Sequence, residues 1–166
     1  LGGNSGNPIF DWFIGRELNP RIGEFDIKTF NELRPGLILW ALLDISCVCH
    51  QYTKFGWVSD SIVLVTLFHV WYIVDSLINE STILTQMDIT TDGFGFMLSV
   101  GDLAWLPFTY CLQARFLAFH PIHLGWLGVL AILAVQFTGY YIFRVANLEK
   151  NEFRHGRNPK GTFAMR

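Results

Sequence analysis

The chain has 166 residues, of which 51% are hydrophobic and only 16% are charged, and its formal net charge is −2. Soluble domains carry about 25% charged residues on average, so this composition favours a lipid environment. It gives no case for nucleic-acid binding, because the chain has no basic stripe with interleaved aromatic residues.

The first segment, 1–34, is polar and carries a charged, rigid sequence at 15–21, just ahead of long apolar runs. Ionisable residues at the edge of a membrane core are costly, so a dense cluster there indicates a function or a structural requirement. We expect Arg16, Glu17 and Arg21 to pair with one another or with neighbouring spans. Neither chain end closes a recognisable element, so we expect an internal piece of a longer membrane protein.

Four segments are long and apolar enough to cross a bilayer, which takes about 20 residues. They are predicted at about 35–52, 58–78, 93–119 and 123–146. The third is interrupted by Asp102 and Pro107, which a span tolerates where it lines an enclosed cavity. Lysine and arginine cluster before the first span and after the fourth, which places both ends on the cytoplasmic face.

The sequence therefore predicts an all-α, polytopic transmembrane bundle organised in three parts. Segment 1–34 is a cytoplasmic-side loop, 35–146 holds the four spans, and 147–166 is a cytoplasmic basic segment.

Acidic residues near the second span are candidates for chemistry, because each is costly in lipid unless it is paired, wet or protonated. Tyr72, Asp75 and Asn79 share one helix face by their spacing, and Glu80 follows directly. That face can hold a proton donor in a mostly apolar pocket. A polar seam that binds neighbouring helices is an equally good interpretation of the residues alone.

The loop 87–96 carries Asp88 and Asp92 among threonines and glycines. Thr91 or Asp92 suits a helix N-cap, but capping does not require Asp88. The alternating glycines allow the backbone to approach a ligand closely. The histidines form no ligand cluster, so no metal site is predicted, and His69 is interpreted as a core or lumen-facing residue.

Lys150 and Arg154 are four residues apart just after the last span. A continuing helix places both on one face, where two cations can grip phosphates and arginine offers a bidentate fork. A positive-inside membrane anchor is the alternative, and the residues alone favour it.

Residues 6–21 read Gly-Asn-Pro-Ile-Phe-Asp-Trp-Phe-Ile-Gly-Arg-Glu-Leu-Asn-Pro-Arg. They resemble the signature of the sterol reductase family that includes the fungal delta-14 sterol reductases, the sterol domain of lamin B receptor and the delta-7 reductase. The likeness continues through 32–36, 87–98, 101–102, 107–110 and 139–144, and the motifs look like the delta-14 branch. Phe10 departs from the family's usual Tyr or His, so that position is given no catalytic role.

The resemblance implies a multi-pass enzyme of the endoplasmic reticulum membrane with about ten spans, about four of them in this chain. Such an enzyme reduces the delta-14 double bond of a sterol diene with NADPH, on the route to ergosterol. A proton from an enzyme acid adds to the diene, and hydride quenches the tertiary cation at carbon 14. The implied partners are the sterol diene, membrane lipid and, as candidates, other sterol-pathway enzymes.

Residue roles carry over selectively from the resemblance. Lys150 and Arg154 resemble the family's basic pair that contacts the cofactor's phosphates, which reverses the anchor interpretation. Tyr72, Asp75 and Glu80 match a segment lining the sterol cavity, and they are assigned catalytic roles with Asp75 as the proton relay.

Asp88 and Asp92 are assigned to substrate binding, and the turn at 15–21 is assigned to structure. Most other cofactor residues of the family belong to a carboxy-terminal part that is absent here, so this fragment alone is expected to be inactive.

Two other functions remain open at this stage. The first is a reductase of another sterol double bond, and the second is a non-catalytic membrane scaffold resembling lamin B receptor. A transporter is less well supported, because it would carry inverted repeats that this sequence lacks.

Overall fold

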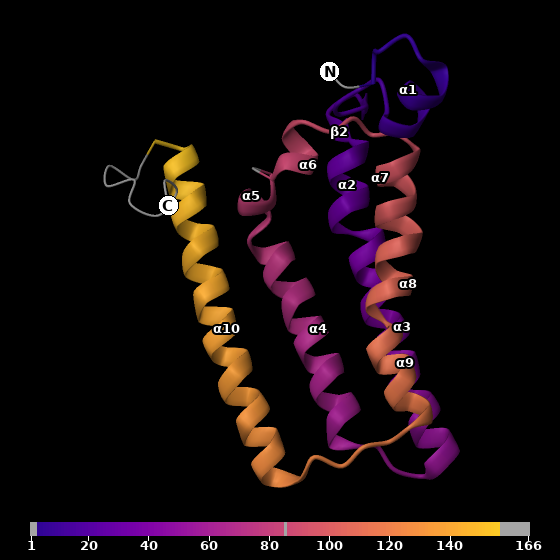
Figure 1. Cartoon of the computed structure of the whole chain (residues 1–166), viewed down its shortest axis with the longest axis vertical. Helices are drawn as coiled ribbons and strands as arrows, with labels where there is room; N and C mark the ends of the chain where they lie inside the picture. The colour runs from indigo at the N-terminus through magenta and orange to yellow at the C-terminus, as the bar shows by residue number, and fades with distance from the viewer. Residues whose placement is uncertain (1–2, 85, 157–166) are drawn as a thin grey trace. The chain divides into compact units, whose positions relative to one another are not determined.

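The computed structural model describes residues 3–84 and 86–156 and is largely helical (Figure 1). The chain divides into two units, Leu1–His123 and Leu124–Arg166. The elements from α1 to α9 belong to the first unit, and the long helix α10 belongs to the second.

The first helix, α1 (Pro8–Ile14), has clear start and stop signals. The Asn7 side-chain oxygen accepts hydrogen bonds of 3.1 and 3.4 Å from two backbone N–H groups of the first turn, and proline occupies the first helical position. The helix ends at Gly15, whose φ of 94° lies in the region that favours glycine.

A small hairpin follows, formed by strands β1 (Arg21–Ile22) and β2 (Phe25–Asp26), which pair antiparallel. Asp26 then caps α2 (Ile27–Leu33), because its Oδ1 accepts a 3.0 Å hydrogen bond from the backbone N–H of Thr29. The all-α prediction therefore misses this pair of two-residue strands.

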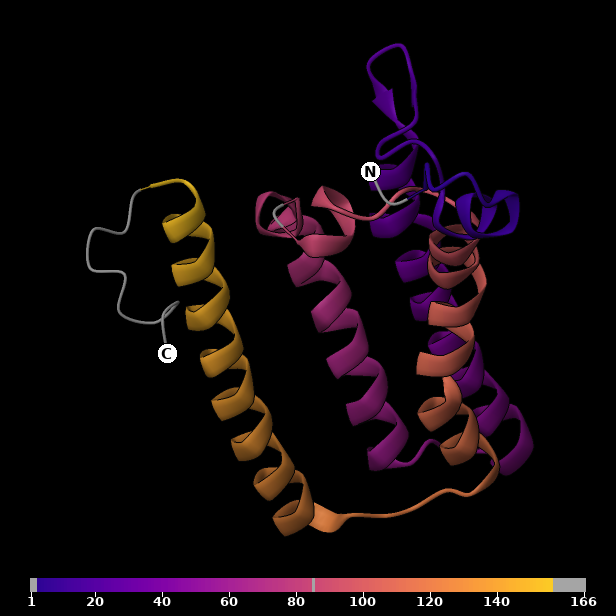
Figure 2. The same ribbon diagram turned by 45° about the horizontal axis from the view of Figure 1, so that its top comes forward.

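Two long helices follow, α3 (Pro35–Phe55) and α4 (Asp60–Ile78), and they run antiparallel beside each other (Figures 1 and 2). A proline begins α3, and Gly56, with a φ of 78°, ends it. Large apolar side chains such as Leu42 and Leu67 are each 57% exposed on these helices, as expected for surfaces that face lipid.

Short helices come next, and they include the predicted break in the third span. They are α5 (Glu80–Ile83), α6 (Met87–Thr90), α7 (Phe96–Val100), the π-helix η1 (Gly101–Trp105), α8 (Leu106–Tyr110) and α9 (Leu112–Phe119). The elements η1, α8 and α9 pack along α3 (Figure 1). The widened π-turn lies at Asp102, and Pro107 follows it in α8, where the sequence predicted the interruption.

Three helical stretches are long and apolar enough to cross a membrane within the described residues: Ile27–Phe55, Asp60–Ile78 and Gly125–Arg154. They match the first, second and fourth predicted spans. The third, at 93–119, is not among them because it is divided into short helices, so the prediction of four spans is not confirmed.

The apolar core of the first unit lies against the amino-terminal half of α3. Leu37 and Trp40 of α3 lie in a buried cluster with Ile73 of α4 and Cys111, which precedes α9. Near the carboxy-terminal end of α3, Gln51 donates a 2.7 Å hydrogen bond to the Leu117 carbonyl of α9. It also accepts a 2.6 Å hydrogen bond from the N–H of Ser59, just before α4. These contacts hold α3, α4 and α9 together.

The second unit contains α10 (Gly125–Arg154), a helix of 30 residues with none buried. It continues past the predicted end at 146. Lys150 and Arg154 therefore lie on its carboxy-terminal part.

Candidate functional site

The turn at 15–21 and the loop at 87–96 are bound to each other by backbone contacts. A Cβ atom on Gly15 would overlap the backbone of Phe94 and Gly95. The Glu17 carbonyl also accepts a 2.9 Å hydrogen bond from the Phe94 N–H. From the sequence, the glycines of the loop were expected to allow a ligand to come close. In the structure, Gly93 and Gly95 are needed because the backbone of Ile14 and Gly15 passes against them.

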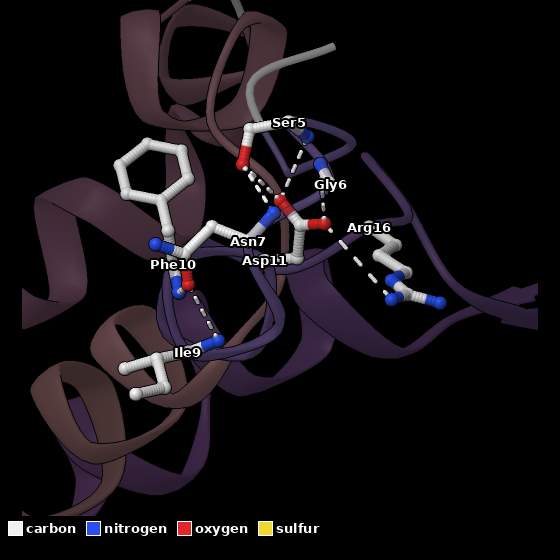
Figure 3. A network of polar contacts seen from close by, with 7 residues as sticks. All are labelled: Ser5, Gly6, Asn7, Ile9, Phe10, Asp11 and Arg16. Carbon is white, nitrogen blue, oxygen red and sulfur yellow. Dashed lines mark hydrogen bonds and ion pairs between the residues drawn. The ribbon is translucent and has the colours of Figure 1, made fainter.

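Asp11 is the centre of a polar network in the first segment (Figure 3). Its carboxylate is 2% exposed and accepts hydrogen bonds of 2.8 Å from both the N–H and the hydroxyl of Ser5 and of 3.2 Å from the Gly6 N–H. The Arg16 guanidinium lies 3.9 Å away. The Ser5 N–H lowers the pKa of Asp11 most, and burial only partly opposes it.

The expected pairing of the turn's arginines is wrong, because each meets an acid outside the turn and outside the spans. Arg16 is paired with Asp11, whereas Arg21 reaches Asp26 at 3.3 Å across the hairpin. Burial raises the pKa of Asp26, but the Thr29 N–H and the Asn19 amide outweigh it, so that pKa is lowered. The two arginines of the turn are therefore paired locally, whereas its backbone contacts the distant loop at 87–96.

A cavity of about 610 Å³ lies beside this network, between α1 and α7. It is lined by Pro8, Asp11, Trp12, Gly15, Arg16, Phe94, Gly95, Phe96 and Ser99. None of the residues to which the sequence assigned catalysis, substrate binding or cofactor binding is part of this lining.

Lys28, which the sequence did not single out, holds the loop that carries Asp88 and Asp92. Its side chain is fully buried, and its ammonium donates hydrogen bonds of 3.0 and 2.6 Å to the carbonyl oxygens of Ile89 and Asp92. The carboxylates of Glu32, Asp92 and Asp88 act electrostatically on that ammonium. The structure thus brings both predicted substrate-binding acids to the amino-terminal end of the first candidate span.

One part of this group of charged side chains around Lys28 could be predicted from the sequence. Lys28 and Glu32 are four residues apart and therefore share a face of α2. Glu32 Oε2 and Asp102 Oδ2 are buried with no hydrogen-bond partner among the described residues. The Lys28 ammonium acts electrostatically on Asp102 as well as on Asp88 and Asp92, so one cation links α2, the loop at 87–96 and η1.

The predicted catalytic residues lie at one end of α4 and the start of α5, with different partners. Asn79 donates hydrogen bonds to Asp75, 3.0 Å to the carboxylate and 2.9 Å to the carbonyl, so the predicted shared face exists. Tyr72 lies on the same face, and its ring centroid is 5.9 Å from that of Trp40. Glu80 instead receives a two-pronged contact from Arg34, with the shorter distance 3.0 Å.

One turn before Tyr72 on α4, a hydrogen-bonded pair of side chains joins α4 to α3. His69 Nδ1 lies 2.6 Å from Asp44 Oδ2, and Asp44 is fully buried. The His69 ring also contacts Trp40, with centroids 4.6 Å apart. The interpretation of His69 as a core or lumen-facing residue did not identify Asp44 as its partner, because that pairing depends on how two helices pack.

Lys150 and Arg154 are exposed and lie one helical turn apart on α10. Two exposed cations at this spacing, one of them a guanidinium, suit phosphate oxygens, so these residues fit the phosphate part of a dinucleotide. Within the described residues, the structure contains no group of three or more metal-ligating side chains.

Known proteins resemble the chain closely. A family model described as the ergosterol biosynthesis ERG4/ERG24 family matches residues 1–165. The delta(14)-sterol reductase erg24 of Schizosaccharomyces pombe is 67% identical over 158 residues, covering 95% of this chain and 37% of that protein. The Saccharomyces cerevisiae delta(14)-sterol reductase ERG24 is 59% identical over 157 residues, covering 95% and 36%.

The delta(14)-sterol reductase of Ascobolus immersus is 61% identical, with 92% of this chain and 36% of that protein covered. The chain thus spans little more than a third of the length of these relatives. Because the family model matches nearly every residue, the chain belongs to the ergosterol biosynthesis ERG4/ERG24 family.

Proposed function

We propose that the full-length protein is a delta-14 sterol reductase that reduces a sterol diene in ergosterol biosynthesis with NADPH. The observation that carries this proposal is 67% identity to a protein named delta(14)-sterol reductase over 95% of this chain. The apolar helices and the polar face of α4 agree with it, because the reaction needs a proton donor beside an apolar substrate.

Reduction begins with a proton from the α4 face, where Tyr72 and Asp75 lie one turn apart. The proton adds to the diene and leaves a tertiary cation at carbon 14. The apolar surfaces of α3 and α4 exclude water, which would otherwise trap that cation. A nicotinamide, when bound, supplies the hydride that completes the reduction.

Glu80 is the third residue of this catalytic assignment, and its contacts favour positioning. Its ion pair with Arg34 ties the start of α5 to the junction between α2 and α3. Through this ion pair, Glu80 holds the carboxy-terminal end of α4, where Tyr72 and Asp75 lie.

Asp88 and Asp92 are proposed to bind the polar end of the sterol. Both lie on the loop that the Lys28 ammonium holds against α2. A carboxylate there can accept a hydrogen bond from the sterol hydroxyl while the rings lie along the apolar helices.

The proposed topology has about four crossings in this chain and about ten in a full-length protein of the endoplasmic reticulum membrane. The third predicted span, 93–119, supplies the crossing that is not a single long helix. Its helical part, 96–119, is about 36 Å long at 1.5 Å per residue, more than the hydrocarbon thickness of about 30 Å. Its packing along α3 supports this assignment.

Sterol profiling of cells tests the function. The full-length protein should restore delta-14 reduction in cells that lack their own reductase and should clear the accumulated diene. A different reduced product would identify a reductase of another double bond. Correct membrane insertion without any reduction would favour a scaffold and contradict the proposal.

The cofactor assignment has its own test in full-length enzyme. Changing Lys150 and Arg154 to Ala should raise the KM for NADPH by about tenfold or more, since two charge-assisted contacts are lost. The KM for the sterol should not change. Glu152→Gln, an exposed neighbour on α10, is the control, and an unchanged KM for NADPH in the double variant would remove the assignment.

A further inference from the structure

Asp44 and His69 form a hydrogen-bonded pair in the middle of two candidate spans, and the His69 side chain is 16% exposed. Asp44 lies near the centre of α3 and His69 near the centre of α4. Asp44 is fully buried, and its Oδ2 is 2.6 Å from His69 Nδ1. Ionisable residues at this depth are costly and face the bundle interior, where they pair with one another.

The hydrogen bond between His69 Nδ1 and Asp44 Oδ2 contains one proton. The other ring nitrogen, Nε2, can carry a second proton, and the imidazole is then a cation beside the Asp44 carboxylate. Replacing a buried ion pair by well-packed apolar side chains of similar volume often leaves stability unchanged or raises it. Helix packing alone therefore does not require the pair.

The surroundings of the pair contain polar atoms that no protein group satisfies within the described residues. Asp44 Oδ1, Trp40 Nε1 and Thr66 Oγ1 are buried and have no hydrogen-bond partner there. Trp40 is one turn before Asp44 on α3, and Thr66 is one turn before His69 on α4. Buried polar atoms nearly always have a partner, and ordered water is the usual one where protein groups are missing.

Trp40 connects the pair to the proposed reacting face. Its ring centroid is 4.6 Å from that of His69 and 5.9 Å from that of Tyr72. Because His69 and Tyr72 are three residues apart, they lie on one side of α4, followed by Asp75. His69 and the predicted proton donors therefore occupy consecutive turns of α4.

We propose that the Asp44–His69 pair is the proton store that recharges the Tyr72–Asp75 face after each turnover, with water at the unpartnered atoms as the link. This inference rests on the proposed function. Asp44 is a positioning residue, because it acts only by holding the imidazole through Nδ1.

The proton balance of the proposed step is simple. After the α4 donor has protonated the diene, the Nε2–H bond of His69 breaks and an O–H bond forms on the donor through the intervening water. The imidazole keeps its Nδ1–H contact with Asp44, and a solvent proton restores Nε2–H. Both electrons of the reduction come with the hydride of the nicotinamide.

Other titratable groups also face the pair and bear on any pH dependence. The thiols of Cys47 on α3 and Cys111 before α9 interact electrostatically with Asp44, and Arg115 on α9 acts on both thiols. Tyr110 of α8 contacts the Trp40 ring, with centroids 5.0 Å apart. Variants of the pair itself are therefore needed to assign a pH effect to it.

The test measures kcat and KM of full-length enzyme across neutral and alkaline pH. His69→Gln and Asp44→Asn should each lower kcat by about tenfold or more, within the range expected for lost proton transfer, and leave the sterol KM within about twofold. The alkaline limb of the kcat profile should move or vanish. Asp44→Glu should recover part of kcat.

The matched control is Gln51→Leu, which removes another buried polar residue of α3. Gln51 bonds the Leu117 carbonyl and Ser59. Its loss should reduce the amount of folded enzyme but leave the pH profile of the remaining enzyme unchanged.

A rescue experiment separates chemistry from space filling. Added imidazole should restore activity to His69→Gly, whereas pyrazole, a ring of the same size that is a much weaker base, should not. Equal rescue by both rings, or wild-type kcat and pH profiles in the pair variants, overturns the inference while wild-type enzyme still reduces the diene. A wild-type enzyme that does not reduce the diene overturns the proposed function and this inference together.

Discussion

Asp11 and Asp44 are both buried acids, but their surroundings differ in kind. Asp11, 2% exposed, receives hydrogen bonds from Ser5 and Gly6 and lies near the Arg16 guanidinium. Asp44, fully buried, meets His69 through one oxygen, and its other oxygen has no hydrogen-bond partner within the described residues. A fully satisfied carboxylate stabilises a fold, whereas a half-satisfied one leaves capacity for water or chemistry.

The same contrast separates two regions of the first unit. The network around Asp11 and the contact between Gly15 and Gly95 shape the segment that carries the family signature. The polar residues of α3 and α4 around Trp40 are the ones for which we propose chemistry. Substitutions in the first region should therefore change stability, and substitutions in the second should change turnover.

The largest expected effect is on the chemical side. Asp75→Asn in full-length enzyme should lower kcat for diene reduction by about 100-fold or more, because general acid catalysis contributes that much. Val74→Ala, at an exposed position on the same helix, should behave like wild type. Normal turnover in Asp75→Asn would remove the proton-relay assignment.

On the structural side, Gly15→Ala should cause the largest loss of stability. An added Cβ would overlap the backbone of Phe94 and Gly95, and φ is 94° at this position. We expect a loss of about 3 kcal/mol, the upper end for overpacking, seen as a lower yield of folded protein and a lower unfolding temperature.

Gly23→Ala is the matched control for that loss, because its φ of 63° is also positive but nothing lies within 4 Å of an added Cβ. It should cost about 1 kcal/mol, from backbone strain alone. Equal losses of stability in the two variants would show that the close approach of the Phe94–Gly95 backbone to Gly15 does not make the substitution at Gly15 more costly.

A pH effect of intermediate size should follow from Asp11 and Asp26, whose pKa values are lowered in the folded protein. A lowered pKa contributes stability that is present above the unfolded value, 3.8 for both groups, and is lost as the pH falls below it. Thermal unfolding of the full-length protein between about pH 6 and pH 3 checks this.

Asp11→Asn should lower the unfolding temperature near neutral pH by a few degrees and flatten its fall in acid. If the unfolding temperatures of wild type and Asp11→Asn fall equally steeply with pH, the Asp11 carboxylate does not contribute to the pH dependence of stability.

The smallest expected effect is at the ion pair between Arg34 and Glu80. Their side chains are 39% and 32% exposed, so solvent screens the attraction. A double-mutant cycle with Arg34→Met and Glu80→Gln should give a coupling energy below about 1 kcal/mol in stability. A markedly larger coupling in kcat than in stability would instead support a catalytic role for Glu80.

Local spacing was enough to predict part of this structure. Long apolar runs predicted α3, α4 and α10, and the i, i+3, i+7 spacing placed Tyr72, Asp75 and Asn79 on one face. Asp102 and Pro107 indicated the break that became η1 and α8. In each case the evidence lies within one segment of the chain.

Contacts between distant segments could not be predicted in the same way. Lys28 reaches the Ile89 carbonyl across 61 positions of sequence, and Arg34 reaches Glu80 across 46. Asp44 and His69 become partners only when the faces of α3 and α4 meet. These pairings follow from helix packing, which a single sequence does not specify by spacing.

The most direct test of the contrast measures turnover per folded molecule and unfolding temperature for Asp11→Asn and Asp44→Asn in full-length enzyme. The account predicts that Asp11→Asn lowers the unfolding temperature and keeps turnover per folded molecule, whereas Asp44→Asn lowers turnover per folded molecule by about tenfold, beyond any loss of stability. Full turnover in Asp44→Asn, or a loss of turnover in Asp11→Asn as large as in Asp44→Asn, would contradict it.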